Sequence, residues 1–182
     1  MCNKIKNAAI YCASSNEIND IYKNAAAELA VLLAKKGINI INGAGNMGLM
    51  QVISDAALAV GGTVTGVIPD FMIERGWCHQ NLTKVINVTS MHERKKTIAE
   101  LSDVAIALPG GYGTFEELLE IITWRQLRLY LNPVIILNIN GFYDPLIELF
   151  NRAINEKFIR PENLSLWKAV ETPMEVIRLL ND

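Results

Sequence analysis

The stretch "VAIALPGGYGTFEELLE", residues 104–120, joins an apolar run to a helical pattern through a turn that contains three glycines. The run at 104–108 is short and apolar, as in a buried strand, and the leucines and isoleucines after the turn recur at helical spacing. A strand that leads through a tight turn into a helix is the building unit of a parallel sheet, because parallel neighbours need a crossover of about a dozen residues. The stretch therefore predicts an α/β fold.

The same alternation of strands and helices continues along the whole chain. Strands are predicted at 8–13, 38–42, 63–69, 85–88, 104–108 and 133–139, with a last one after Trp167. Helices are predicted at 22–37, 45–62, 90–102, from the glycine turn to about Tyr130, at 143–157 and at the C-terminal end, whereas 70–84 predicts a loop. The order indicates a single domain over residues 1–182 with a doubly wound parallel sheet and helices on both faces. Ligands of such sheets bind outside the carboxyl ends of the strands.

Composition and charge exclude several classes of partner. Seventeen Lys and Arg against nineteen Asp and Glu give a formal net charge of −2, which provides no global attraction to nucleic acid or to an anionic membrane. No apolar run approaches the roughly 20 residues that span a bilayer. Cys2, Cys12 and Cys78 are odd in number and lack a C-x-x-C spacing, as expected of reduced thiols. We therefore expect a cytoplasmic protein that binds an anionic ligand locally.

The glycine turn is the first candidate for that binding. Gly110, Gly111 and Gly113 permit positive φ and close approach of a ligand to the backbone, so that successive N–H groups could converge on a phosphate at a helix N-terminus. Thr114 could cap the helix and also donate to the ligand. The alternative is that the glycines only make a tight turn, since their order matches neither the dinucleotide fingerprint nor the Walker A motif.

Two glutamates follow within the predicted helix. Glu116 and Glu117 fall in its first turn, where the helix dipole alone would favour acidic side chains. Glu116 shares one face with Glu120 and Thr123, at i, i+4 and i+7, which favours Glu116 as the inward-facing carboxylate, although sequence alone leaves this choice open. A carboxylate beside a bound phosphate would face the sugar, where glycosidic chemistry needs an acid, a base or a stabiliser of positive charge.

The segment "MHERKK", residues 91–96, places Arg94, Lys95 and Lys96 near the start of a predicted helix, against the preference of the dipole for acids there. A local departure of this kind often marks a functional site. Arg94 could clamp a phosphate or hold a carboxylate through two hydrogen bonds. A solvated helix face is the alternative, above all for Lys96.

Two further loops follow strands at the same edge of the sheet. Ser14 lies in "CASS", and Gly45 and Asn46 lie in the glycine-bearing stretch "NGAGNMGLMQ", residues 42–51. Each could admit a ligand, but Ser14 could equally cap the next helix and the glycines could serve turn geometry alone.

The only histidines, His79 and His92, have no companions that would suggest a metal site. We expect no metal, and we expect each histidine to be a structural hydrogen-bonding group.

The motifs "PGGYGTFEE" (109–117) and "SMHERK" (90–95) together resemble those of the LOG ("lonely guy") family, the cytokinin riboside 5′-monophosphate phosphoribohydrolases. The pattern P-G-G-x-G-T-x-x-E is matched from Pro109 to Glu117, with Glu116 preceding the last position. The similarity runs from "IYCASS" to about Tyr143. Members of the family were long labelled lysine decarboxylases, but no lysine here stands out as an anchor for pyridoxal phosphate.

The resemblance implies a Rossmann-like homodimer that hydrolyses the N-glycosidic bond of adenosine 5′-monophosphate or its N6-modified form, releasing base and ribose 5-phosphate without a cofactor. It implies essential roles for Arg94 and for a glutamate of the glycine motif, which the shared helix face assigns to Glu116. The substrate contacts that it implies map to Lys95, Gly110, Gly111, Tyr112, Gly113, Thr114, Glu117 and Thr123. The alternative is a non-catalytic carrier of a nucleotide or of molybdopterin.

The chain departs from the family pattern in two places. Asn42, Ala44 and Gln51 replace glycines in the stretch 42–51, and Gly76, followed by Trp77, stands where many relatives carry an acidic residue. The choice between adenine and an N6-prenylated base is therefore open.

Overall fold

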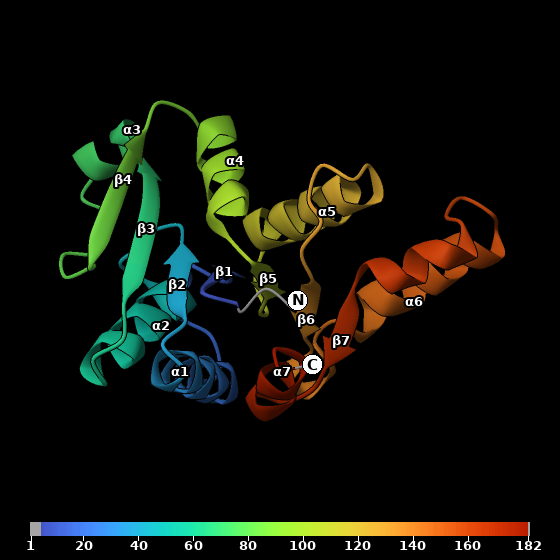
Figure 1. Cartoon of the computed structure of the whole chain (residues 1–182), viewed down its shortest axis with the longest axis horizontal. Helices are drawn as coiled ribbons and strands as arrows, with labels where there is room; N and C mark the ends of the chain where they lie inside the picture. The colour runs from blue at the N-terminus through green and yellow to red at the C-terminus, as the bar shows by residue number, and fades with distance from the viewer. Residues whose placement is uncertain (1–4, 182) are drawn as a thin grey trace.

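Seven parallel strands form one sheet in the computed structural model, which describes residues 5–181 (Figure 1). The strands are β1 (Asn7–Tyr11), β2 (Asn39–Asn42), β3 (Val64–Pro69), β4 (Lys84–Val88), β5 (Val104–Ala107), β6 (Val134–Leu137) and β7 (Lys168–Val170). Their order in the sheet is β4-β3-β2-β1-β5-β6-β7, and every neighbouring pair is parallel. This confirms the predicted doubly wound α/β fold.

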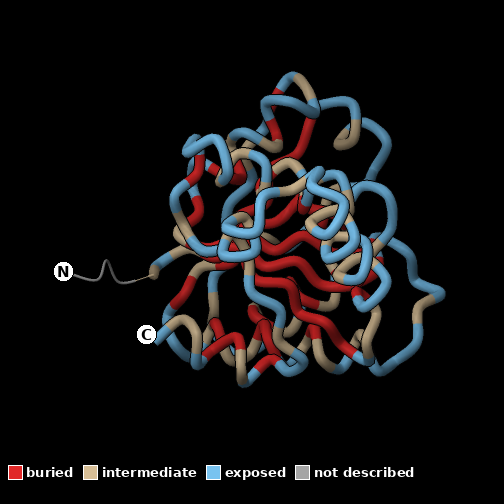
Figure 2. Tube along the Cα trace, turned by 90° about the vertical axis from the view of Figure 1, so that its right-hand side faces the viewer, coloured by how far each residue is buried: buried red, intermediate tan, exposed pale blue. Residues whose placement is uncertain are grey.

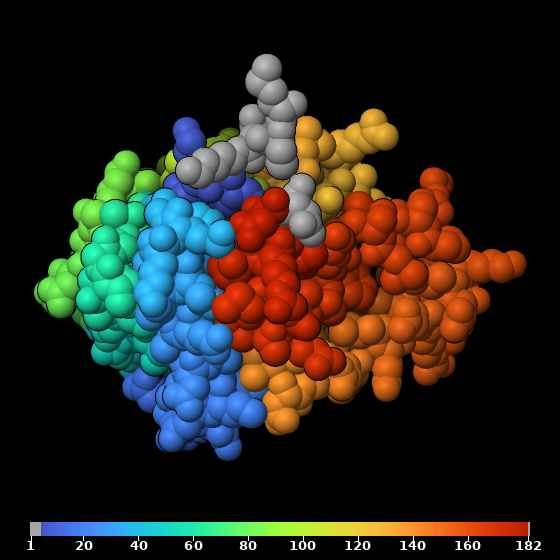
Figure 3. Space-filling model, turned by 60° about the horizontal axis from the view of Figure 1, so that its bottom comes forward, coloured from blue at the N-terminus to red at the C-terminus, as the bar shows by residue number. Residues whose placement is uncertain are grey.

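Helices cover both faces of this sheet. They are α1 (Asp20–Lys35), α2 (Gly48–Ala59), α3 (Asp70–Glu74), α4 (Met91–Leu101), α5 (Tyr112–Gln126), α6 (Asp144–Asn155) and α7 (Pro173–Leu179), with short 3-10 turns at Ile139–Gly141 and Pro161–Leu166. Buried residues of α1, α2 and α7 join one core, and those of α4 and α5 join the other. Figure 1 shows these two layers on opposite sides of the sheet, and Figure 3 shows α1 between α2 and α7.

Each central strand contributes side chains to both cores, because successive side chains of a strand point to opposite faces of the sheet. In β1, Ala8 and Ile10 belong to the core under α1, whereas Ala9 and Tyr11 belong to the core under α4 and α5. A strand that is buried on both faces must be apolar throughout, which is why these segments appear as continuous apolar runs in the sequence. The buried stretches of chain accordingly concentrate in the sheet (Figure 2).

Some boundaries differ from those predicted. Residues 70–84, predicted to be a loop, contain the five-residue helix α3, which is too short to show a period. α5 ends at Gln126 rather than near Tyr130, and Arg128 then adopts a positive φ of 61°. In residues 5–181, none of the helices has the length and the apolar character needed to cross a membrane.

The strand order reverses between β1 and β5, which are neighbours in the sheet although they are far apart in the chain. The loops that follow them are tied together, because Leu108 N donates to Tyr11 O (2.9 Å) and Ala13 N donates to Pro109 O (3.2 Å). A reversal point of this kind leaves a crevice at the carboxyl ends of the two strands. The glycine turn and the "CASS" loop both open into it.

We expect Gly48→Ala to lower the free energy of unfolding by about 3 kcal/mol or more. Gly48 has φ +61°, and a Cβ atom there would lie 2.6 Å from the carbonyl carbon of Ser14 and 2.7 Å from the carbonyl oxygens of Ala13 and Ser15. Gly61→Ala is the matched control, because Gly61 has φ +77° but open space around it, and we expect a loss of only about 1–2 kcal/mol. If urea unfolding gave the same loss of unfolding free energy for both variants, the close contact of residue 48 with the "CASS" loop would make no contribution to stability.

Candidate functional site

A cavity of about 270 Å³ opens at the carboxyl ends of β1 and β5. It is lined by the start of α5, the end of β1 with the loop after it, the residue after β2, two residues of α4 and single residues of α2 and α3. Two clefts of about 460 and 470 Å³ lie elsewhere on the described surface, at the outer ends of α4 and α5 and beside Pro161–Leu166. The smaller cavity is the candidate site because Arg94 and both glutamates of the glycine motif line it together.

Arg94 is buried and fixed by backbone carbonyl groups. Its Nε donates to Val67 O (3.1 Å) and its Nη2 donates to Gly43 O (3.0 Å). A Cβ atom on Gly43 would overlap Nη2, so the guanidinium itself requires a glycine at this position. Burial lowers the pKa of Arg94 and Glu117 raises it, and the group stays charged because a guanidinium pKa starts above about 12. The site therefore contains one permanent positive charge in a fixed place.

Glu117 extends from α5 into the same cavity. Burial raises the pKa of this carboxyl to about 7, while Arg94 lowers it and Glu116 raises it. Glu117 therefore exists in both protonation states near neutral pH. A carboxyl with this pKa can accept a proton and return it within one reaction cycle.

Glu116 lies at the rim of the cavity and pairs with a lysine. Its side chain is 55% exposed, and its Oε1 contacts Nζ of Lys95, which also contacts Glu120 Oε1 at 3.0 Å. The expectation that Glu116 is the inward-facing carboxylate is wrong. Buried Thr114, Leu118 and Ile121 define the inner face of α5, and this spacing places Glu117 on it, whereas Glu116, Glu120 and Thr123 share the outer face.

The helix also begins earlier than predicted. Because α5 starts at Tyr112, both glutamates lie beyond its first turn, so the dipole alone does not account for them. The N-cap is Gly111, not Thr114, whose side chain is buried. The expectation that Thr114 caps the helix is therefore wrong, but Thr114 does line the cavity.

The glycine turn leaves room above the start of α5. None of Gly110, Gly111 and Gly113 has a positive φ, so the turn does not use the positive φ that these glycines permit. A Cβ atom on Gly110 would overlap Thr114, whereas Cβ atoms on Gly111 and Gly113 would meet open space. The first N–H groups of a helix have no intrahelical acceptor, so those of α5 can be reached by an anion in the cavity.

Other predicted site residues divide into those inside and those outside the cavity. Ser14 lines it and does not cap α1, because Asn19 accepts the hydrogen bond from Ile21 N. Tyr112 lines it from an almost fully exposed position. Thr123 lies on the outer face of α5, where its Oγ1 donates to Leu119 O (2.7 Å).

Gly45 and Asn46 hold a neighbouring loop and do not line the cavity. Gly45 forms an antiparallel bridge with Cys78, and Asn46 Nδ2 donates to Gly76 O (2.8 Å). A Cβ atom on Gly45 would lie 2.7 Å from Cε of Met50. Lys95 is likewise not among the lining residues.

Seven lining residues were not among the predicted site residues: Ile10, Cys12, Ala13, Gly43, Met50, Met72 and Met91. Three of them, Met50, Met72 and Met91, add apolar side chains to the lining. Met72 could not be found from the sequence, because it lies on α3, inside the stretch predicted to be a loop. Burial, and then Glu117, raise the pKa of Cys12 far above its usual range, so this thiol stays protonated.

The structure gives His79 the predicted structural role. Its Nε2 pairs with Asp55 Oδ1 (2.9 Å), and its Nδ1 accepts from Asn81 N (3.2 Å). Within residues 5–181, no three His, Cys, Asp or Glu side chains are grouped so that they could hold a metal ion. Cys12 and Cys78 are free thiols, and Cys2 lies outside the described residues.

The chain matches a family model and several known proteins over most of its length. A family model described as "possible lysine decarboxylase" matches residues 50–180. The chain is 40% identical over 179 residues to the probable cytokinin riboside 5′-monophosphate phosphoribohydrolase LOGL2 of Oryza sativa subsp. japonica, covering 98% of this chain and 73% of that protein. It is also 40% identical over 179 residues to the phosphoribohydrolase LOG1 of Arabidopsis thaliana, covering 98% and 84%.

Among solved structures, the molybdenum cofactor binding protein of Rippkaea orientalis matches with a TM-score of 0.73 and 20% identity, covering 100% of this chain and 98% of that one. This likeness shows a shared fold. The site does not support the decarboxylase description. Among the described residues that line the cavity there is no lysine that could anchor pyridoxal phosphate. The extent and identity of the curated matches show that the chain belongs to the LOG family of cytokinin riboside 5′-monophosphate phosphoribohydrolases.

Proposed function

We propose that this protein hydrolyses the N-glycosidic bond of adenosine 5′-monophosphate or of its N6-modified forms and releases the free base and ribose 5-phosphate. The observation that carries this proposal is the presence of Glu117, with a pKa of about 7, in one cavity with the buried Arg94 and the open start of α5. The curated relatives are named for the same reaction class. No cofactor is needed for this hydrolysis.

The 5′-phosphate would bind at the start of α5. Gly111 and Gly113 leave open space there, and Thr114 lines the cavity below them. Free N–H groups and the positive end of the helix dipole both favour a phosphate at such a place. This binding mode would fix the ribose one helical turn further on, beside Glu117.

At that position Glu117 would act on the breaking bond. As the bond between C1′ and the base breaks, positive charge develops on the ribose, which a carboxylate stabilises. Water then bonds to C1′ and one of its protons passes to the Glu117 carboxylate, which returns this proton to the departing base nitrogen. The net change is the addition of water across the glycosidic bond. The positive charge of Arg94 lowers the pKa of Glu117 and so opposes the effect of burial, which would keep Glu117 ionised in a fraction of the molecules.

The base would then lie against methionine side chains of the lining, which are Met50, Met72 and Met91. Thioether side chains are flexible and adapt to different apolar shapes, so these methionines suit both adenine and a base with an N6 substituent. Both substrates therefore belong in the test.

A carrier of molybdenum cofactor is the second candidate, since a protein named for binding that cofactor shares the fold. A carrier has no need of a titrating carboxylate beside its ligand, so Glu117 favours the hydrolase. Tight binding of either nucleotide without any turnover would support the carrier.

The test is to incubate the protein with adenosine monophosphate and with isopentenyladenosine monophosphate and to measure free base and ribose 5-phosphate by chromatography. We expect Glu117→Gln to lower kcat by a factor of about 10² to 10⁴ while nucleotide binding is kept, because the proton acceptor is lost and the shape is not. Glu116→Gln is the matched control, since Lys95 keeps its contact with Glu120, and we expect a loss of at most about threefold. Wild-type turnover by Glu117→Gln would refute the assigned role.

Glu117 should also make stability depend on pH. Its pKa in the folded protein is raised from 4.5 to about 7, so its contribution to the free energy of unfolding is fully present below pH 4.5 and is lost as the pH rises through 7. We expect Glu117→Gln to gain about 2–3 kcal/mol relative to wild type between pH 5 and pH 8. Urea unfolding of both proteins at the two pH values measures this difference, and a constant difference would contradict the raised pKa.

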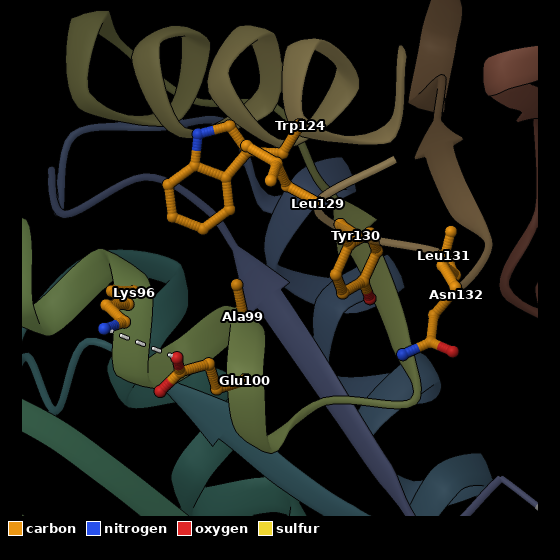
Figure 4. A pocket seen from close by; sticks show the side chains of 8 residues that line it. All are labelled: Lys96, Ala99, Glu100, Trp124, Leu129, Tyr130, Leu131 and Asn132. Carbon is orange, nitrogen blue, oxygen red and sulfur yellow. Dashed lines mark ion pairs between the residues drawn. The ribbon is translucent and has the colours of Figure 1, made fainter. Parts of the chain in front are cut away.

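We also propose that the protein forms a homodimer through the cleft between α4 and α5 (Figure 4). Leu129 and Leu131 beside this cleft are 70% and 75% exposed, which is unusual for a monomer surface with several such groups together. Lys96 and Glu100 lie on the same face, with Lys96 Nζ 3.7 Å from Glu100 Oε1. In a twofold contact, Lys96 of each copy could therefore pair with Glu100 of the other copy.

The double change Leu129→Glu and Leu131→Glu should therefore convert a dimer into a monomer, because two charges would enter the contact. Light scattering after size-exclusion chromatography gives the mass directly. Leu149→Glu on α6, also an exposed leucine, is the control and should leave the mass of the wild type. A wild-type mass of one chain would refute the homodimer.

A further inference from the structure

Lys95 is next to Arg94 on α4, but its side chain takes a different direction. Arg94 enters the cavity, whereas Lys95, whose side chain is 10% exposed, contacts Glu116 and Glu120 on α5. Burial lowers the pKa of Lys95, but its hydrogen bonds to the two carboxylates outweigh burial and raise the pKa overall. The adjacent residues Arg94 and Lys95 thus face the adjacent residues Glu117 and Glu116 across the two helices.

This contact joins two helices that otherwise pack mainly on the sheet. Beyond it the helices are separated by the cleft of about 460 Å³, with Ala99 and Glu100 on one side and Trp124 on the other (Figure 4). At the far end of the cleft, Asn132 Nδ2 donates to Ser102 O (2.8 Å). Of the ion pairs formed by the described residues, those that link α4 to α5 both involve Lys95.

We propose that Lys95 is a positioning residue: it ties α5 to α4 beside the cavity and so holds Glu117 in place relative to Arg94, without contacting the substrate. This inference rests on the proposed hydrolysis. It differs from the substrate contact that the family resemblance implies for Lys95, because the ammonium group donates to Glu116 and Glu120 and Lys95 is not among the residues that line the cavity.

The charges around Glu117 make this arrangement measurable. The groups that interact with it are Arg94 and Lys95 from α4, Glu116 and Glu120 from α5, Tyr11 at the end of β1, and Cys12 in the loop after β1. Burial is the largest influence on the pKa of Glu117, Arg94 and Lys95 lower it, and Glu116 and Glu120 raise it. Without Lys95, the two neighbouring carboxylates would lose their partner, and the pKa of Glu117 would rise further.

The kinetic test compares Lys95→Met, Lys95→Arg and the double variant Glu116→Gln with Glu120→Gln, using both nucleotides. We expect Lys95→Met to lower kcat about tenfold with KM changed by less than about threefold, since orientation is lost and binding is not. Lys95→Arg should recover most of the activity, and the double variant should behave like Lys95→Met. A rise in KM at unchanged kcat would identify Lys95 as a substrate contact and overturn the inference.

A second measurement separates this inference from the proposed reaction. Titration of the Glu117 carboxyl by NMR should show a pKa higher by about half a unit or more in Lys95→Met than in wild type. Lys23→Met is the control, because it removes a lysine whose ion pair with Asp20 lies on α1, and it should leave Glu117 unchanged. If the wild type cleaves neither nucleotide, the proposed function fails, and an unchanged Glu117 pKa in Lys95→Met would then refute the positioning role on its own.

Discussion

The rest of the site depends on the burial of the Arg94 guanidinium. A buried charge is tolerated only where hydrogen bonds replace water, and here the carbonyl groups of Val67 and Gly43 do so. These carbonyls belong to β3 and to the residue after β2, so the register of two parallel strands fixes the charge. The positive end of the α4 dipole disfavours an arginine near the start of that helix, and the carbonyl groups outweigh this preference. The sheet therefore determines where the cation stands.

The two adjacent glutamates of α5 then receive opposite environments from the same helix. Successive residues of a helix are about 100° apart, so Glu117 faces the buried cation while Glu116 faces Lys95 at the rim. One carboxyl is kept near its point of half-protonation, and the other serves in an ion pair. Chemically identical side chains thus acquire different roles through burial and neighbours alone.

The fold could be predicted from the sequence, because the alternation of apolar runs and helical patterns can be seen within short segments of the chain. For α5, the sequence predicted correctly that Glu116, Glu120 and Thr123 share one face of the helix. It did not predict whether this face points toward the sheet or away from it. Periodicity groups residues without orienting them, and Thr114, Leu118 and Ile121 would have shown that the inner face includes Glu117. The reason for Gly43 was beyond sequence reasoning, because its partner Arg94 is 51 residues away and only the folded sheet brings them together.

The glycines of the turn differ in what requires them. Gly110 is needed by the protein itself, since a Cβ atom there would overlap Thr114. Gly113 lies inside the first turn of α5 with an ordinary backbone and open space around it, although a glycine costs a helix about 1 kcal/mol relative to alanine. Neither packing nor backbone geometry accounts for that cost. A phosphate at the proposed place beside the first N–H groups of α5 would account for it, because a side chain at Gly113 would enter the open space of the cavity.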